Sequence, residues 1–314
     1  MLGRPGRVWF EKIKTRSAQE TLGLVIGADQ ISFCVVSGGS VLRLAAEYST
    51  EHESWPKRLA DAVREHNLKG MPCHLILAGD EYKLLPVEVP DVPAAEVDQA
   101  LLWSLRDVLE AQPQDMLVQS FPFAGGLSRP GRAMRHAVAV RKSVIRELAD
   151  GVLAAGLDLH AIDIAELAMC ALVKRLPEDE RGVCVVTQGA RNVVITLHRG
   201  GELYLARQLA GSAQLQDALH PLTGPRLVEQ LGLDLLRTLD YYDSQLQQRP
   251  PAVVCLPPMP AGGELLQRGL AETLNLPVRQ ILFPEFVKLS QPLDAGLQMN
   301  CLFALGGALR GAMG

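Results

Sequence analysis

Two stretches of this chain, IGADQISFCVVSGGSVLRLA from Ile26 and QGARNVVITLHRGGELYLAR from Gln188, resemble each other along their whole length. They align without a gap at an offset of 162 residues. Each alternates β-branched residues between glycines, which predicts strand, tight turn, strand, Gly-Gly hairpin and strand. We therefore expect an internal duplication. The matched positions are Gly27 with Gly189, Ala28 with Ala190, Gly38 with Gly200, and Gly39 with Gly201.

Amphipathic helices follow each strand unit, and short strand-like runs alternate with them, which is typical of a mixed α/β fold. The charged, proline-containing stretch LPEDER, Leu176–Arg181, precedes the second unit and predicts a lobe boundary. We expect a basic tail at 1–20, a first lobe at 21–178 with an inserted subdomain at about 75–150, and a second lobe at 179–314. The helices are predicted at Trp55–His66, Glu96–Glu110 and Leu227–Leu246, and the further strands at His74–Leu77, Ala137–Val140, Val183–Val186 and Ala252–Leu256.

Composition restricts the possible functions. The 314 residues are 48% hydrophobic and 21% charged, with a net charge of −4, as in an ordinary globular protein without a basic field for nucleic acid. No apolar run approaches the roughly 20 residues that cross a bilayer, and no secretory signal is evident, so we expect a cytoplasmic protein. The six cysteines and seven histidines are scattered, which favours buried thiols over metal ligation.

Two similar α/β lobes that each open with a hairpin unit predict the duplicated ribonuclease-H-like architecture of actin and the sugar kinases. In such a fold glycine turns let backbone N–H groups approach phosphates closely. An acidic residue at the end of each first strand usually holds Mg²⁺ or orients water. The candidate nucleotide cleft comprises Gly27, Ala28, Asp29, Gly189, Ala190 and Gly262.

Several motifs, in order along the chain, resemble the PilM/MshI family of actin-like proteins of type IV and mannose-sensitive haemagglutinin (MSHA) pilus biogenesis, with the MshI type most similar. The resemblance implies an actin-like ATPase fold and spans about Leu22 to Arg310. The motifs are LGLVIGADQISF, the proline turn and tryptophan-containing helix of Tyr82–Leu109, LAAGLDLHAIDIAELAM at Leu153–Met169, LLRTLDYYDSQL at Leu235–Leu246, and FALGGALR near the C-terminus.

The chain departs from this family at the residues that handle nucleotide. The acidic positions fall on Val25 and Thr187, and the adenosine segment reads LPPMPAGG, whose prolines remove backbone donors. Without these carboxylates no side chain at the expected positions remains to bind Mg²⁺ directly, although Asp29 is an alternative. We therefore expect a degenerate site with no catalytic residues, no metal and no cofactor; ATP with Mg²⁺ stays open as the alternative, in an active ATPase of pilus or type II secretion assembly.

The resemblance implies a cytoplasmic scaffold that links inner-membrane assembly proteins to the cytoplasmic machinery. Its implied partner is the short cytoplasmic N-terminal tail of a PilN- or MshJ-like membrane protein, and the assembly ATPase is a further candidate. A groove of the first lobe is expected to hold this tail, with Asp98, Trp103 and Asp107 at its rim. The alternative is that these acids form the solvated face of an amphipathic helix, and that Trp103 belongs to the core.

The N-terminal sixteen residues carry five basic side chains and one acid. Contact with anionic lipid is worth about 1 kcal/mol for each basic residue near the surface, which suggests a peripheral position at the inner membrane. An ordinary frayed terminus is the equally weighted alternative. The candidate membrane contacts are Arg4, Arg7, Lys12 and Lys14.

Overall fold

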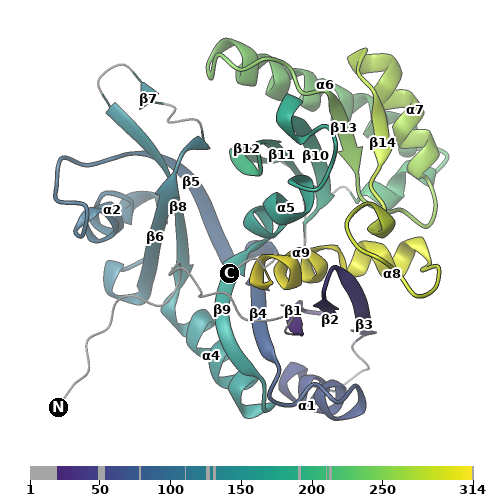
Figure 1. Cartoon of the computed structure of the whole chain (residues 1–314). Helices are drawn as coiled ribbons and strands as arrows, with labels where there is room; N and C mark the ends of the chain where they lie inside the picture. Colours follow the sequence, from purple (N-terminus) through teal and green to yellow (C-terminus); the bar gives the residue numbers. More distant parts are fainter. Residues whose placement is uncertain are drawn as a thin grey trace. The chain divides into compact units, whose positions relative to one another are not determined.

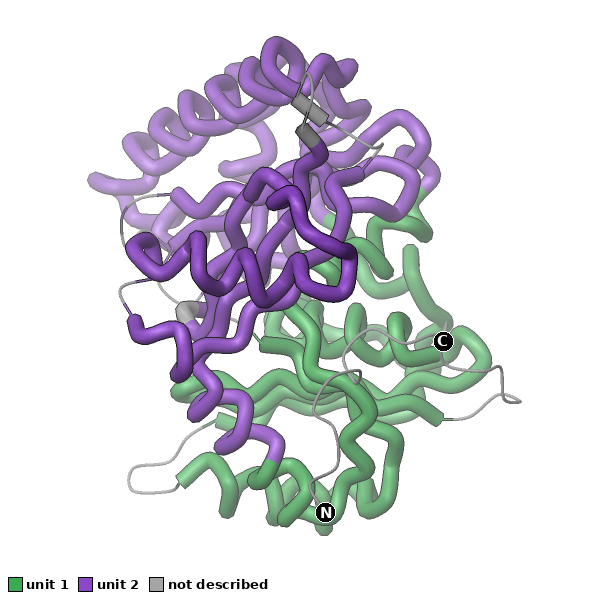
Figure 2. The backbone as a smooth tube through the Cα atoms, turned by 90° about the vertical axis from the view of Figure 1, so that its left-hand side faces the viewer, with its two compact units in different colours: residues 1–78, 150–176, 281–314 green, residues 79–149, 177–280 purple. Residues whose placement is uncertain are grey.

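The computed structural model describes residues 20–48, 54–77, 79–109, 111–124, 128–129, 132–189, 192–209, 211 and 214–312. These divide into two compact units (Figure 2). Unit 1 takes its described residues from 1–78, 150–176 and 281–314, and unit 2 from 79–149 and 177–280. The proposed membrane contacts Arg4, Arg7, Lys12 and Lys14 lie outside the described residues, as does Ala190.

Unit 1 is built on a five-stranded sheet in the order β3-β2-β1-β4-β9. Figure 1 shows α9 over one face of this sheet and α1 over the other. Small residues allow α9 to lie close, because a Cβ on Gly23 of β1 would lie 1.9 Å from the carbonyl oxygen of Ala304. The elements of unit 1 are β1 (Thr21–Ile26), β2 (Gln30–Ser37), β3 (Ser40–Tyr48), α1 (Trp55–Glu65), β4 (Pro72–Leu77), β9 (Asp158–Ile164), α5 (Ala165–Val173), α8 (Ala295–Asn300) and α9 (Leu302–Gly311).

Unit 2 contains a second five-stranded sheet in the order β12-β11-β10-β13-β14. The long helix α6 and the helix α7 pack against it through one apolar core that includes Leu235, Tyr242 and Leu270. The helix α4 (Lys142–Ala154) crosses the division between the units. The elements of this lobe are β10 (Val183–Gln188), β11 (Val193–Arg199), β12 (Glu202–Gln208), α6 (Gly224–Ser244), β13 (Val253–Leu256), α7 (Gly263–Leu274) and β14 (Val278–Gln280).

The predicted repeat is confirmed by the pairing of the strands. Thr21 pairs with Val36 in unit 1, and Val183 pairs with His198 in unit 2, so both antiparallel pairs share one register at the offset of 162. Each second strand carries an irregularity at the equivalent place, between Val35 and Val36 and between Leu197 and His198. The Gly-Gly hairpins also match, since all four glycines have positive φ, a conformation that glycine adopts without strain.

Unit 2 also contains a smaller sheet with the order β5-β8-β6, to which β7 adds. Its apolar face is covered by two short helices instead of the single predicted helix Glu96–Glu110. The hydroxyl of Ser104 donates to the Leu101 carbonyl at the break, a contact that bends helices. Val108, beyond this break, is turned outward and is 52% exposed. The elements are β5 (Tyr82–Glu88), α2 (Val97–Ser104), α3 (Arg106–Leu109), β6 (Met116–Pro122), β7 (Ser128–Arg129) and β8 (Arg132–Arg141).

This division of the chain differs from the expected lobes in two places. The described part of 281–314, which the sequence assigns to the second lobe, packs in unit 1, where α9 contacts β1, β2 and β4. The small sheet, expected as an insertion in the first lobe, belongs to unit 2, and its Ala124 joins the core of the second lobe. Both differences arise from contacts between residues far apart in the chain, which local sequence patterns do not report.

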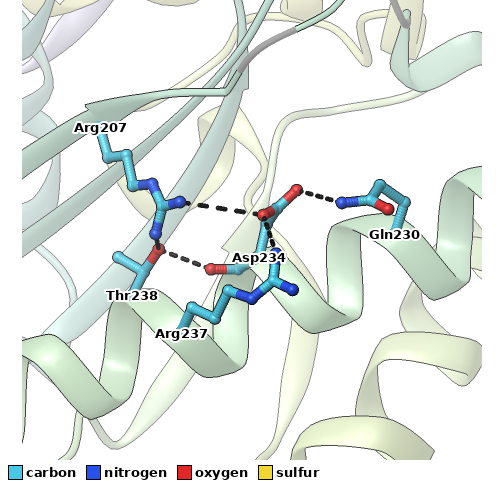
Figure 3. A network of polar contacts seen from close by, with 5 residues as sticks. All are labelled: Arg207, Gln230, Asp234, Arg237 and Thr238. Carbon is cyan, nitrogen blue, oxygen red and sulfur yellow. Dashed lines mark hydrogen bonds and ion pairs between the residues drawn. The ribbon is translucent and has the colours of Figure 1, made fainter.

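A polar network fixes α6 against β12 (Figure 3). Arg207 of β12 donates to the Thr238 hydroxyl at 3.1 Å, and that hydroxyl donates to the Asp234 carbonyl at 2.6 Å. The Asp234 carboxylate accepts from Gln230 at 2.9 Å and from Arg237 at 3.4 Å. These partners offset the desolvation of a carboxylate that is only 14% exposed.

The described cysteines are all buried thiols, as predicted.

Among the described helices, none combines the length and the apolar character needed to span a bilayer.

Candidate functional site

The first glycine turn joins β1 to β2 in unit 1. The Gly27 N–H donates to the Gln30 carbonyl at 2.8 Å, which closes the turn. Arg58 of α1, only 5% exposed, donates to the carbonyl oxygens of Asp29 at 3.3 Å and Ala28 at 3.5 Å. The Arg58 guanidinium therefore forms hydrogen bonds with the two carbonyl oxygens that could otherwise bind a cation.

The second turn joins β10 to β11 in unit 2, and it closes in the same way. The Gly189 N–H donates to the Asn192 carbonyl at 2.8 Å. A Cβ on Gly189 would lie 2.7 Å from the Asn192 Oδ1 and 3.0 Å from the Asn192 carbonyl oxygen, so the turn leaves little room for a side chain here. Here an amide replaces the arginine: Gln188 Nε2 donates to the carbonyls of Gly189 and Asn192, at 3.0 and 3.1 Å.

The two positions that should carry an acid lie at equivalent points of the two sheets. Val25 pairs with Ser32, and Thr187 pairs with Val194, one residue before the end of each first strand. Val25 is an apolar, buried side chain, and the Thr187 hydroxyl reaches the Val194 carbonyl at 3.5 Å. Neither side chain offers a carboxylate. The Asp29 side chain is exposed on its turn, and no group of three His, Cys, Asp or Glu in the described ranges is arranged to hold a metal.

The third part of the predicted cleft, Gly262, lies just before α7 with φ of +78°. A Cβ there would lie 3.0 Å from Leu219 Cγ, and one on Gly263 would lie 2.5 Å from Gln280 Nε2. The Gln280 Oε1 also accepts from the Met259 N–H at 2.9 Å. The segment between β13 and α7 is thus packed against its own lobe by neighbouring side chains.

A buried acid that the sequence analysis did not select lies in unit 1. Asp163, at the end of β9, forms an ion pair with Arg310 of α9 and accepts from the Ile164 N–H at 2.9 Å. Burial raises the pKa of the Asp163 carboxyl, and Arg310 opposes this rise. The residue sits inside the quoted stretch LAAGLDLHAIDIAELAM, but only the fold places α9 beside it.

The predicted rim residues of the partner groove lie on the two short helices of the small sheet. Asp98 is half-buried and accepts from the Ser120 hydroxyl, to which Arg135 Nε also donates at 2.8 Å. Trp103 is not a core residue, because 56% of it is exposed. The Asp107 side chain is 85% exposed and lies 3.4 Å from the neighbouring Arg106. Trp103 and Asp107 are thus available to a partner, whereas Asp98 is held within a network.

Several solved structures are similar to this chain over most of its length. A chain of the PilM-PilN type IV pilus biogenesis complex matches with a TM-score of 0.73 and 22% identity, covering 93% of this chain and 98% of that one. The chain has an actin-like ATPase fold. The same fold relates it to a Bacteroides thetaiotaomicron protein of unknown function with an actin-like ATPase fold, at a TM-score of 0.53 and 13% identity over 91% and 96% of the two chains.

A third similar structure is the cytoplasmic domain of EpsL, an inner-membrane component of the type II secretion system of Vibrio cholerae. It matches with a TM-score of 0.52 and 15% identity, covering 91% of this chain and 95% of that domain. No protein-family model and no curated protein sequence matches the chain. At these identities the similarity establishes the fold and not the function.

Proposed function

We propose that this protein is a scaffold of a type IV-like pilus assembly machine, with MSHA-type pili as the specific case, and that its nucleotide site is degenerate. The observation that carries the proposal is the similarity to a chain of the PilM-PilN complex over 93% of this sequence. The motif LLRTLDYYDSQL on α6 supports the MSHA assignment. Val25 and Thr187 support the loss of ATPase chemistry, because neither supplies the carboxylate that holds Mg²⁺ or orients water in this fold.

The proposed location is the cytoplasmic face of the inner membrane, and the proposed partner is the N-terminal tail of a PilN- or MshJ-like membrane protein. A short tail carries little apolar surface, so it must bind through backbone hydrogen bonds and a few side-chain contacts. Trp103 and Val108, each more than half exposed, offer apolar contacts on the outer side of α2 and α3. Asp107 adds a negative charge that suits a basic tail. The assembly ATPase is a second proposed partner.

The test is binding of the labelled tail peptide to the full chain, followed by fluorescence anisotropy. We expect Trp103→Ala and Asp107→Lys to weaken binding, and high salt to weaken it further because the charge contact is screened. Asp243→Lys, an exposed acid on α6, is the matched control and should bind as the wild type does. The two charge reversals, Asp107→Lys and Asp243→Lys, are at exposed positions and should each change the free energy of unfolding by less than about 0.5 kcal/mol. A wild-type protein that does not bind the tail would refute the scaffold mechanism.

The second candidate is an active, ATP-binding member of the same fold. It is favoured by the two glycine turns, which keep the same closing hydrogen bond in both lobes. Such turns present backbone N–H groups to phosphates even where the metal-holding acids are gone. The measured affinity for Mg·ATP separates the two candidates.

A further inference from the structure

The second lobe contains a cavity of about 480 Å³ that the proposed function does not use. It lies where β10 begins and β11 ends, beside the proline segment that follows α6. Three of its lining residues are arginines, and one is an acid. The lining comprises Glu180, Arg181, Arg199, Arg249, Pro250 and Ala252.

Arg199 is held in one orientation by backbone and side-chain oxygens. Its Nη2 donates to the carbonyls of Arg249 at 2.9 Å and Arg181 at 3.3 Å, and its Nη1 donates to Gln248 Oε1 at 3.2 Å. Gly182, with φ of +94°, lies directly against it, since a Cβ there would be 3.3 Å from Arg199 Nη2. The guanidinium is therefore ordered before any ligand arrives, which lowers the entropic cost of binding.

The positive charge around this cavity is not neutralised within the described part of the chain. No carboxylate there forms an ion pair with any of the three arginines, and Glu180 is the acidic residue of the lining. Arg199 Nε and the Tyr242 hydroxyl are both buried without a hydrogen-bond partner. Burial raises the pKa of Tyr242 to about 12 although Arg199 opposes the rise, so the phenol is neutral at physiological pH.

We propose that this cavity is a binding site for a phosphate group, presented by a soluble phosphate ester or by a phospholipid headgroup. Three guanidinium groups around one pocket carry a net excess of positive charge over the single carboxylate. Phosphate matches guanidinium geometry through paired N–H donors, and its charge relieves the mutual repulsion of the arginines. The volume admits a phosphate together with the group that it esterifies.

The test uses the full chain with Arg181→Gln and Arg249→Gln combined, because both side chains are exposed and the double variant should fold. Titration of inorganic phosphate at constant ionic strength should give saturable binding to the wild type and about tenfold weaker binding, or none, to the variant. The matched control combines Arg226→Gln with Arg268→Gln, which removes two exposed arginines elsewhere in the same unit. This control should bind phosphate as the wild type does.

Vesicles of phosphatidylglycerol then distinguish the two sources of phosphate. Weaker co-sedimentation of the Arg181→Gln/Arg249→Gln variant, relative to wild type and control, assigns the site to a lipid headgroup. Equal co-sedimentation, with phosphate binding still lost, assigns it to a soluble ester. Equal phosphate affinity of the variant and the wild type would overturn the proposal, and so would acetate binding as tight as that of phosphate.

Discussion

Arg310, in the last turn of α9, pairs with the carboxylate of Asp163 at the end of β9, and only 7% of that acid is exposed. Replacing Arg310 by Gln leaves the carboxylate buried without a counter-charge. We expect a loss of about 3 kcal/mol in unfolding free energy at neutral pH. The deficit should shrink at low pH, where the carboxyl is protonated. Urea unfolding of Arg310→Gln and Arg310→Lys at pH 7 and pH 4 is the measurement, and equal stability of the two variants at pH 7 would contradict this expectation.

The contact between Gly23 and α9 predicts a second effect on stability. A methyl group on Gly23 would meet the backbone of Ala304 at 1.9 Å and that of Ala308 at 2.5 Å, so Gly23→Ala must displace the helix. We expect a loss of about 3 kcal/mol or more. Gly200→Ala is the comparison, because its Cβ meets nothing within 4 Å and its positive φ of +61° alone should cost about 1 kcal/mol. Thermal melts that rank the two variants in the opposite order would show that α9 is not closely packed.

Three buried histidines predict instability toward acid. Burial lowers the pKa of His198 from 6.5 to about 3, and those of His74 and His136 to about 4. The folded protein therefore binds fewer protons than the unfolded chain in this pH range. The free energy of unfolding is highest above pH 6.5 and falls as the pH drops from there toward 4. Urea midpoints between pH 7.5 and pH 5 should show this fall. His198→Gln, which stays neutral, should show a smaller fall in the urea midpoint. A pH dependence equal to that of the wild type would argue against a contribution of His198 to the acid sensitivity.

Nucleotide binding should be weak and hydrolysis negligible. Val25 and Thr187 supply no carboxylate for Mg²⁺, and the Arg58 guanidinium already donates to the carbonyls of Ala28 and Asp29 in the first turn. Calorimetric titration with Mg·ATP should give a dissociation constant above about 10 µM, which corresponds to roughly 7 kcal/mol of binding at most. Tighter binding that depends on Mg²⁺ would favour the active ATPase instead.

The basic N-terminal segment is tested by deleting residues 1–16. If Arg4, Arg7, Lys12 and Lys14 contact anionic lipid, the deletion should reduce co-sedimentation with phosphatidylglycerol vesicles. Added salt should have the same effect on the intact chain, since it screens the attraction. Equal co-sedimentation of the two proteins would remove the proposed membrane contact.

Local patterns were sufficient to predict the hairpin units. Alternating β-branched residues and paired glycines determine strand and turn, so the repeat and its register follow from residues such as Gly38 and Gly200. The buried side chain of Tyr242 and the exposed one of Tyr241 follow from helical spacing in the same way. Once the two strand units are aligned, the sequence also shows directly that neither of the expected acidic positions, Val25 and Thr187, carries an acid.

Features that depend on distant contacts were not predictable. The ion pair between Asp163 and Arg310 joins a residue before β10 to one after β14. No sequence pattern around either residue indicates the other. The cavity lined by Arg181, Arg199 and Arg249 likewise gathers three segments that are separate in the chain. Trp103 lies on an amphipathic helix, where its apolar character suggested the core, but the helix ends one residue later and leaves the ring exposed.

The assembly of unit 1 from three separated stretches has a consequence for synthesis on the ribosome. The strands β1 and β2 emerge early, yet the helix that covers one face of them, α9, is among the last parts to be translated. Unit 2 can complete its core before then, because all of its residues precede 281. Domains fold as their residues become available, so β1 and β2, which are translated first, are not covered by α9 until the end of translation. This apolar face is where a nascent-chain chaperone should bind.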